Sequence, residues 1–310
     1  MTSYATLPHL TANQVFDHLS IRDAVVGLEQ VLKDGLAPRE AHKRSSVPLE
    51  HGSFLLMPSE HGEYAGVKIA SVTPDNPEHG LPKIQASFLL FNSSTLAPIA
   101  ILDGTALTSI RTPAVSALGL NELAPPDAST VLVFGTGPQA YHHVRATAAV
   151  RPVTRVEVVG RTPDKARRLV DDLNAADVTA SVGSGDSVPK ADIILCCTSA
   201  HEPLFDGSKV REDAVVVAMG SHEPDVRETD DALISRSTVY VEDVQTALRE
   251  AGDIVIAIRN QALCGEDLRE LPELVRLGAE DRTGPAFFKT VGMGWEDLVV
   301  AQLAYEAYMR

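Results

Sequence analysis

The sequence predicts a two-domain α/β protein, in which a doubly wound parallel sheet is joined to a smaller α+β domain. Three observations predict this class: the length of the chain, a change of hydrophobic pattern after Pro125 and Pro126, and the alternation of strands and helices that follows. A chain of 310 residues suggests two domains at roughly 150 residues each. The 44% of hydrophobic residues provide the material for a sizeable core. We expect one domain over 1–115 together with 295–310, and the other over 116–294.

The first part of the chain predicts helices around a small sheet. Residues 11–36 predict one helix, because apolar residues recur at helical spacing after Thr11, a candidate N-cap. A further helix is expected over 107–124, before the two prolines. Four short apolar runs bounded by Gly, Pro and Asn predict strands of an antiparallel or mixed sheet, at 53–58, 64–72, 84–91 and 97–102.

From residue 129 onward, strands alternate with helices. Consecutive Val and Ile residues suit parallel strands that are buried on both faces. We expect strands within 129–135, 154–160, 178–182, 191–199, 214–221 and 238–242, and helices over 137–150, 163–175 and 228–235. This alternation is typical of a doubly wound sheet. At the C-terminus, Trp295–Arg310 predicts an amphipathic helix that returns to pack on the first domain.

The overall charge restricts the classes of partner. Lys and Arg total 27 and Asp and Glu total 42, which gives a net charge of −15. This acidic surface argues against a general nucleic-acid binder, because it repels phosphates. A phosphate-bearing ligand therefore needs a local positive pocket.

No apolar run approaches the roughly 18 to 20 residues of a membrane span, so we expect no membrane partner. The N-terminus lacks the pattern of a secretory signal. The three cysteines have no CxxC spacing and the histidines are scattered, so we expect no disulfide framework, no metal and a cytoplasmic location.

A glycine-rich motif of the form G-x-G-x-x-A lies between a predicted strand and a predicted helix. It consists of Gly135, Thr136, Gly137, Pro138, Gln139 and Ala140. The first glycine permits a tight turn, the second lets the backbone approach a pyrophosphate, and the small last residue lets helix and strand pack closely. The N-terminus of the helix then faces the phosphates. The motif in this context predicts a Rossmann-type dinucleotide site, with a plain glycine turn as the alternative.

The end of the next predicted strand indicates which dinucleotide is bound. An NAD site usually carries Asp or Glu there, bonded to the ribose hydroxyls, whereas here Gly160 is followed by Arg161 and Thr162. A guanidinium suits a 2′-phosphate, and Thr162 adds a hydroxyl. The next helix adds basic charge at Lys165, Arg167 and Arg168. The sequence therefore favours NADP(H) over NAD(H). The alternative is that these basic residues are simply the solvated start of a helix.

Several blocks of sequence together resemble the ornithine cyclodeaminase/mu-crystallin family over essentially the whole chain. They are Met57-Pro58, Gly66-Val67-Lys68, NPEHGLP at 76–82, LDGTALTSIRTPAVSA at 102–117, the glycine motif and FKTVGMGWED at 288–297. The LDGT…RT block is highly specific. The resemblance implies an NAD(P)-dependent homodimer, in which the domain of 1–115 and 295–310 binds substrate and dimerises. The domain of 116–294 is then the Rossmann domain.

The resemblance also implies roles for particular residues. Lys68 and Arg111 match residues that line the substrate site beside the nicotinamide, and Arg44 matches a second arginine that holds the substrate carboxylate. Two arginines clamp a carboxylate well, and a lysine of lowered pKa exchanges protons with a substrate nitrogen. For Arg44, an ordinary loop charge is the alternative. The resemblance also implies a set of cofactor contacts: Thr112, Gln139, Ala140, Thr198, Met219, Gly220, Val291 and Gly292. For each of these, a turn residue with a purely structural role is the alternative.

The chain departs from the ornithine-cyclising members of this family. Those members carry acids where this chain has Leu55 and His222, and the loss of both acids counts against ornithine cyclisation. Glu223 or Asp225, in the same loop as His222, is the alternative source of an acid. His222 is a candidate acid or base, with a loop histidine as the alternative. Lys83 stands where relatives often have a threonine near the cofactor.

Three functions follow from the resemblance. The first is NADP-dependent reduction of a cyclic ketimine or imino acid such as Δ1-pyrroline-2-carboxylate, or a related amino-acid dehydrogenase reaction. The second is cyclodeamination of ornithine to proline and ammonia with recycled NAD. The third is NADPH-dependent binding of a small ligand, as in mu-crystallin. The presence of Lys68, Arg44 and Arg111 favours the first over pure binding.

Overall fold

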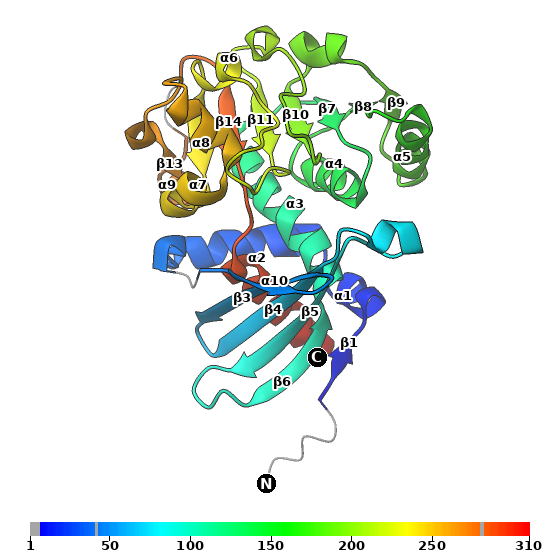
Figure 1. The fold of residues 1–310 in the computed structure, drawn as a ribbon, viewed down its shortest axis with the longest axis vertical. Coiled ribbons are helices and arrows are strands. Elements are labelled where there is room, and N and C mark those ends of the chain that lie inside the picture. The colour runs from blue at the N-terminus through cyan, green and yellow to red at the C-terminus, as the bar shows by residue number, and fades with distance from the viewer. Residues whose placement is uncertain (1–6, 41–42, 280–281) are drawn as a thin grey trace. The chain divides into compact units, whose positions relative to one another are not determined.

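The computed structural model describes residues 7–40, 43–279 and 282–310. The chain divides into two compact units, of which the first comprises Met1–Thr112 and Gly292–Arg310 and the second comprises Pro113–Val291 (Figure 1). The first boundary falls within helix α3 (Gly104–Leu123), directly before the proline inside that helix. In the described part of the chain, no helix has the length and apolar character that crossing a membrane requires.

The first unit is built on a six-stranded mixed sheet. Its strands are β1 (His9–Leu10), β2 (Ser45–Leu49), β3 (Gly52–His61), β4 (Tyr64–Val72), β5 (Ile84–Asn92) and β6 (Pro98–Asp103). Their order is β1-β6-β5-β4-β3-β2, and every described pair is antiparallel except β1 with β6. The four predicted strands and the mixed character of the sheet are confirmed. The two edge strands β1 and β2 were not predicted, because β1 has two residues and β2 is exposed throughout.

The prediction of a single helix over 11–36 was wrong. Two helices occupy this segment, α1 (Ala12–His18) and α2 (Ile21–Lys33). Between them Ser20 adopts an extended backbone, and its hydroxyl accepts a hydrogen bond from the backbone of Asp23 at 3.1 Å. A serine cap of this kind starts a new helix, and apolar periodicity that continues across it conceals the break.

The C-terminal helix α10 (Gly294–Tyr308) lies within the first unit, but its predicted amphipathic character was wrong. Every residue from Gly294 to Ala301 is buried. The helix packs against β3, β4 and β5 on one side and against α1 and α2 on the other, so its first eight residues meet protein on every face. A helix enclosed in this way has no solvent-facing stripe.

The second unit is built on an eight-stranded parallel sheet. Its strands are β7 (Thr130–Phe134), β8 (Arg155–Val159), β9 (Ala180–Val182), β10 (Ile193–Cys196), β11 (Val215–Ala218), β12 (Thr238–Val241), β13 (Arg269–Glu270) and β14 (Ala286–Lys289). Their order is β13-β12-β14-β11-β10-β7-β8-β9. The chain runs outward from β7 through β8 and β9 and then returns to β10 on the other side of β7. The carboxyl ends of β7 and β10 therefore flank the switch point where such sheets bind ligands.

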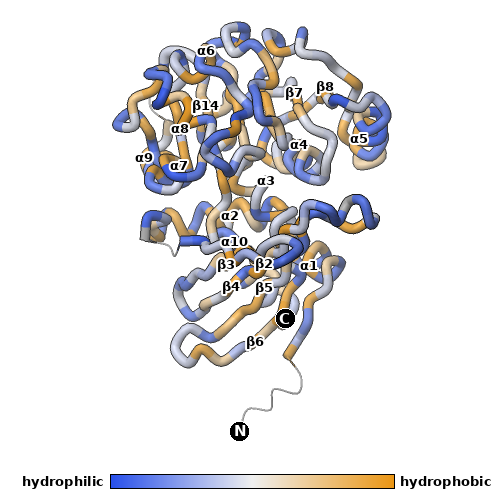
Figure 2. Tube along the Cα trace, viewed as in Figure 1, coloured by the Kyte–Doolittle hydropathy of each residue, from blue (hydrophilic) through white to orange (hydrophobic). Residues whose placement is uncertain are grey.

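The doubly wound sheet was predicted correctly, and its helices follow the expected alternation. They are α4 (Pro138–Val150), α5 (Pro163–Ala175), α6 (Asp231–Ile234), α7 (Val244–Glu250), α8 (Gly252–Arg259) and α9 (Leu271–Leu277). The last three, and strand β14, were not assigned from the sequence. Figure 2 shows apolar and polar residues alternating along α5, which buries one face only. Short 3-10 helices lie at Pro38–Glu40, Asn76–His79, Gly185–Lys190, Gly207–Lys209 and Gly265–Asp267.

Candidate functional site

A buried cluster of four charged side chains lies in the first unit. Nζ of Lys68, on β4, lies 2.9 Å from Oδ1 and 2.7 Å from Oδ2 of Asp297. Arg111, on α3, donates Nε to the same Oδ1 at 3.2 Å and Nη1 to Oε2 of Glu296 at 2.8 Å. All four are at most 6% exposed. Two cations and two anions make the cluster formally neutral, which is the condition under which charges can be buried.

The elements around the cluster explain its place. Lys68 pairs in register with Met57 of β3 and Phe88 of β5, so its side chain stands on the sheet face that α10 covers. Glu296 and Asp297 occupy the first turn of α10, where the helix dipole favours negative charge. The helix begins against β3 at Gly294, where a Cβ would lie 2.9 Å from the carbonyl oxygen of Pro58.

The cluster changes the proton affinity of Lys68. Burial, and to a lesser degree the neighbouring Arg111, lower the pKa of its ammonium to about 8. Asp297 and Glu296 oppose this shift. The hydroxyl of Thr108 donates to the carbonyl of Gly104 at 2.7 Å, so its oxygen is an acceptor for Nζ at 3.3 Å. A lysine with this pKa can give and take a proton near neutral pH.

Gly292 is packed directly against Arg111. Its φ is +80°, which favours glycine, and a Cβ there would overlap Nη1 and come within 2.7 Å of Nη2. The sequence placed Gly292 near the nicotinamide, and that role stays a prediction. What the structure adds is a steric reason for glycine at this position.

Sequence reasoning missed three members of this site. Glu296 and Asp297 lie in the FKTVGMGWED block and Thr108 lies in the LDGT…RT block, yet none was assigned a role. Two adjacent acids at the start of a mainly apolar helix were the available signal, because buried carboxylates require partners. Their partners could not be named without the fold.

The remaining first-unit candidates lie in different environments. Arg44 directly precedes β2 and is partly buried, as is Leu55 on β3, whereas Lys83 is exposed. Thr112 is buried, and its hydroxyl oxygen has no hydrogen-bond partner within the described residues. Such an orphaned oxygen is what a residue that contacts a ligand would present.

In the second unit, the glycine motif forms the turn from β7 into α4. Gly135 has φ +122°, and its amide donates to the carbonyl of Val159 at 2.9 Å. A Cβ there would overlap the carbonyl oxygen of Cys197. A Cβ on Gly160 would overlap the methyl group of Thr136, and Ala140 is fully buried. These positions need small residues for internal packing.

Gly137 is different, and it tests whether the turn fits a dinucleotide. It is the N-cap of α4, is exposed, and a Cβ built on it meets no atom within 4 Å. No side chain caps the helix, Pro138 occupies its first turn, and the buried Oε1 of Gln139 has no hydrogen-bond partner in the described chain. An uncapped helix N-terminus beside open space fits a pyrophosphate. The residues present therefore fit the dinucleotide cofactor.

Glu228 joins the loops that follow two central strands. Its Oε1 accepts hydrogen bonds from the backbone and the hydroxyl of Thr198, after β10, at 2.8 and 2.7 Å. Its Oε2 accepts from the backbone of Gly220, after β11, at 2.7 Å. Burial raises the pKa of Glu228 to about 7, against the opposing charge of Lys289 and with a further raising effect of Asp253. Sequence reasoning singled out Thr198 and Gly220 but not the carboxylate that links them.

The other second-unit candidates lie around the same sheet. Met219 follows β11 directly, and its amide donates to the carbonyl of Cys196 at 3.1 Å. The amide of Val291 donates to Glu242 at 2.8 Å. His222 is exposed, with Nδ1 3.2 Å from the carbonyl oxygen of Gly220.

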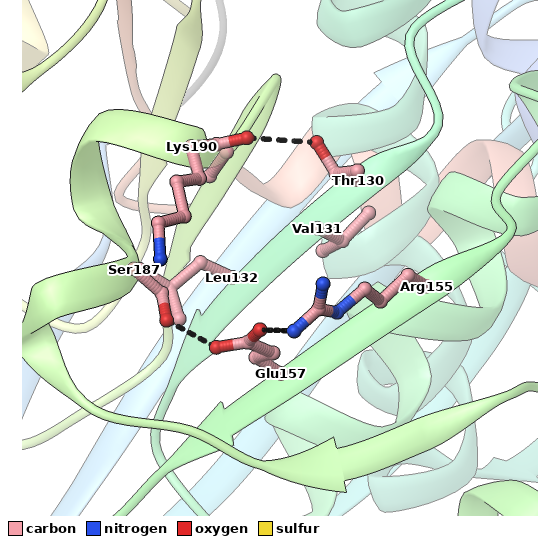
Figure 3. Close-up of a pocket in the computed structure, with 8 residues that line it drawn as sticks. Thr130, Val131, Leu132, Arg155, Glu157, Ser187 and Lys190 are labelled. Carbon is pink, nitrogen blue, oxygen red and sulfur yellow. Dashed lines mark hydrogen bonds and ion pairs between the residues drawn. The ribbon is translucent and has the colours of Figure 1, made fainter.

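The end of β8 carries exposed basic residues and no acid. Arg161 and Thr162 are exposed, and Thr162 is the N-cap of α5 without a side-chain capping bond. Arg167 is exposed and pairs with Asp164. Glu157, the acid on β8, is bonded to Arg155 and Ser187 instead (Figure 3).

Figure 3 shows the small pocket that contains Glu157. Its lining residues are Thr130, Val131, Leu132, Arg155, Glu157, Ser187, Lys190 and Ala191. Thr130 and Arg155 are the first residues of β7 and β8, so the pocket lies toward the amino ends of the strands. Its volume of about 40 Å³ is far below that of a nucleotide site, so it is not the cofactor pocket.

Comparison with known proteins agrees with this arrangement. The sequence profile of the ornithine cyclodeaminase/mu-crystallin family matches residues 10–310. The chain is 32% identical over 312 residues to the Δ1-pyrroline-2-carboxylate reductase of Colwellia psychrerythraea, covering 96% of this chain and 98% of that protein.

Two solved structures share the whole fold. The Thermococcus litoralis Δ1-pyrroline-2-carboxylate reductase in complex with NADH and L-proline is 28% identical, with a TM-score of 0.91 and 98% of each chain covered. An archaeal alanine dehydrogenase dimer with bound NAD is 25% identical, with a TM-score of 0.89, covering 98% of this chain and 96% of that one. The resemblance in the sequence is thereby confirmed, and the chain belongs to the ornithine cyclodeaminase/mu-crystallin family.

Proposed function

We propose that this chain is an NAD(P)H-dependent reductase of C=N bonds, which converts a cyclic imino acid such as Δ1-pyrroline-2-carboxylate to the cyclic amino acid. The observation that carries the proposal is the buried cluster in which Lys68 and Arg111 share the carboxylate of Asp297. It holds a proton donor and a carboxylate-binding cation side by side. The relatives from Colwellia psychrerythraea and Thermococcus litoralis, which carry this activity in their names, support it.

The chemistry divides between the cofactor and the chain. The reduced nicotinamide, when bound, supplies the hydride that the imine carbon receives. Lys68 donates a proton from Nζ to the imine nitrogen, so that the C=N double bond becomes a C–N single bond while a C–H and an N–H bond form. Arg111, with Arg44, binds the substrate carboxylate and orients the ring. Burial of the cluster keeps water away from the charges and strengthens both interactions.

For the cofactor, we propose a preference for NADP(H). The end of β8 presents Arg161 and Thr162 to solvent, and the acid of that strand, Glu157, is held by Arg155 and Ser187. A guanidinium at this position pairs with a 2′-phosphate, whereas a site for NAD would place a carboxylate there. The solved relatives are described with NADH or NAD, so this preference is a property we assign to the present chain alone.

We further propose that two copies form a homodimer through the sheet of the first unit. By strand alternation, the face opposite α10 carries Val47, Phe54, Ile69, Leu89 and Ile101. All five retain exposure to solvent, and Val47 and Phe54 are 41% and 40% exposed. Apolar side chains that remain exposed together on one sheet face favour a cover, although Ser71 and Ser87 lie between them. The dimeric archaeal alanine dehydrogenase supports a second copy as that cover.

The activity is tested by mixing the purified protein with Δ1-pyrroline-2-carboxylate and NADPH or NADH. We expect loss of reduced-nicotinamide absorbance together with formation of proline. The Lys68→Ala variant should lose most of its turnover while keeping its cofactor affinity. No consumption of either cofactor would refute the proposal.

A second assay separates this reaction from cyclodeamination. Incubation with ornithine and NAD, without added imine, should yield neither proline nor ammonia. This expectation rests on the uncharged Leu55, which is partly buried on the same face of β3 as Met57, where the cyclising members carry an acid. Proline and ammonia formed without net change of cofactor would instead identify a cyclodeaminase.

A further inference from the structure

Asp297 is the centre of the buried cluster, although neither the motif nor the proposed chemistry assigns it a task. Its Oδ1 receives both Nζ of Lys68 and Nε of Arg111, and its Oδ2 lies 2.7 Å from Nζ. The side chain is fully buried. It therefore contacts both the proposed proton donor and the proposed carboxylate-binding cation.

The hydrogen bonds of Lys68 leave one direction open. An ammonium has three N–H donors. One is directed at Asp297 and one at Thr108, whose own proton is committed to Gly104. Within the described residues no other hydrogen-bond partner of Nζ is found. Because the ammonium is tetrahedral, the two hydrogen bonds to Asp297 and Thr108 fix the direction of the third N–H.

The charges that face Lys68 come from two helices. Arg111 on α3 repels the ammonium, while Asp297 and Glu296 on α10 attract it. The strands on either side present only Met57 and Phe88, which are apolar. Glu296 is bonded to Arg111, so Asp297 is the only carboxylate among these groups that bonds Lys68 directly.

We propose that Asp297 is a positioning residue, which aims the free N–H of Lys68 at the imine nitrogen and keeps the ammonium charged beside Arg111. This inference rests on the proposed function. Without the carboxylate, Lys68 would face the guanidinium with one neutral acceptor, Thr108. The ammonium would lose its proton at a lower pH and would be free to rotate.

The test compares Asp297→Asn with Glu296→Gln, which makes the same chemical change one residue earlier in the same buried turn. In the wild type, kcat/KM for reduction should fall above about pH 8, where Lys68 loses its proton. In Asp297→Asn the decline of kcat/KM at basic pH should begin about one pH unit lower, or more. Its kcat at neutral pH should fall at least about tenfold. In Glu296→Gln the pH at which kcat/KM declines should shift less than in Asp297→Asn, and the main change should be a raised KM.

A second readout does not depend on turnover. The 13C resonance of the Lys68 side chain, identified by its absence from Lys68→Arg, is titrated in the wild type and in Asp297→Asn. We expect a lower midpoint in the variant. If the wild type does not reduce the imine, the proposed function fails while this titration still tests the electrostatic part of the inference. If the imine is reduced but neither the basic decline of kcat/KM nor the titration midpoint of Lys68 shifts in Asp297→Asn, the positioning role of Asp297 is overturned and the proposed function stands.

A conservative variant covers the case in which Asp297→Asn does not fold. Asp297→Glu retains the charge but displaces it by one methylene group. We expect the decline of kcat/KM at basic pH to stay near that of the wild type, because the negative charge is kept. We expect kcat to fall, because the N–H of Lys68 is no longer directed at the imine nitrogen. An unchanged kcat in folded Asp297→Glu would overturn the positioning role.

Discussion

The guanidinium of Arg111 lies directly against Gly292, with Nη2 only 2.7 Å from where a Cβ on that glycine would stand. Gly292 also has φ +80°, so any side chain is both strained and in collision. The two residues are distant in sequence, and each constrains the other.

The first prediction concerns this packing. Gly292→Ala should displace the guanidinium and raise KM for the imino acid at least about tenfold, the effect of losing roughly one charged hydrogen bond. Steady-state kinetics measures the change. Gly35→Ala is the control, since Gly35 has φ +101° but open space around its Cβ. It should cost about 1 kcal/mol of stability and leave KM unchanged. Equal KM values in Gly292→Ala and the wild type would contradict the role of Arg111.

The second prediction separates ligand space from packing space in the glycine motif. Gly137→Ala should leave the melting temperature without cofactor unchanged, because its Cβ meets no protein atom. It should weaken NADPH binding at least about tenfold, because the methyl group would lie where we expect the pyrophosphate to approach the backbone. Nicotinamide fluorescence measures the affinity. Gly135→Ala should instead destabilise the protein itself, owing to φ +122° and the overlap with Cys197.

The third prediction tests the choice of cofactor. Arg161→Ala should weaken NADPH binding about tenfold or more and affect NADH little, because only NADPH carries the 2′-phosphate. Arg155→Ala serves as the control, since Arg155 is exposed at the opposite end of the same strand and pairs with Glu157. Calorimetric Kd values for both cofactors decide the matter. An equal loss for NADPH and NADH would remove the assigned phosphate contact.

The fourth prediction concerns pH and the buried Glu228. Its pKa is about 7 in the folded protein against 4.5 for an ordinary glutamate. Between these values the folded carboxyl keeps its proton while the unfolded one is ionised, so the folded state binds more protons. The stabilising contribution of this group is therefore fully present below about pH 4.5 and is lost as the pH rises through about 7.

Urea unfolding of the wild type and Glu228→Gln at about pH 4.5 and about pH 8 measures this effect. The wild type should lose more of its free energy of unfolding over this range than the variant, which has no titrating group at this position. The variant should also be less stable at both pH values, because its amide opposes the N–H of Gly220. Parallel pH dependences in the two proteins would show that Glu228 does not titrate here.

The fifth prediction concerns assembly. Phe54→Asp places a charge on the apolar face of the first sheet, and it should convert the proposed homodimer to a monomer that remains folded. Light scattering after size exclusion measures the mass. Leu96→Asp is the control, since Leu96 is 65% exposed in the turn between β5 and β6. A wild-type mass of a single chain would refute the proposed homodimer.

The doubly wound sheet was predictable because its signals are local. Strands β7, β10 and β11 are buried on both faces, and a strand in that position is a run of Val, Ile and Leu in any context. Helix α5 begins and ends at the predicted residues, since its charged and apolar sides alternate along the sequence. The glycine turn was predictable for the same reason, because φ and close approach act on single residues.

Tertiary packing decided the elements whose local pattern is ambiguous. Strand β14 inserts between β11 and β12 although it comes last in the chain, and no periodicity encodes a neighbour. The first eight residues of helix α10 are all buried because the helix packs between a sheet and two helices. The sequence of α10 contains two acids at its start, and only this enclosure makes them buried partners rather than a solvated helix terminus.

By itself, the sequence predicted a dinucleotide-binding sheet, and its resemblance to a known family implied that Lys68 and Arg111 line the substrate site. Only the tertiary structure decided what those cations touch. Asp297 is separated from Lys68 by 229 positions and from Arg111 by 186, and the three meet because α10 packs on the face of β4. Periodicity along a chain reports which side of an element is buried. The partner of a buried charge is set by which elements pack together, and that depends on the folded chain as a whole.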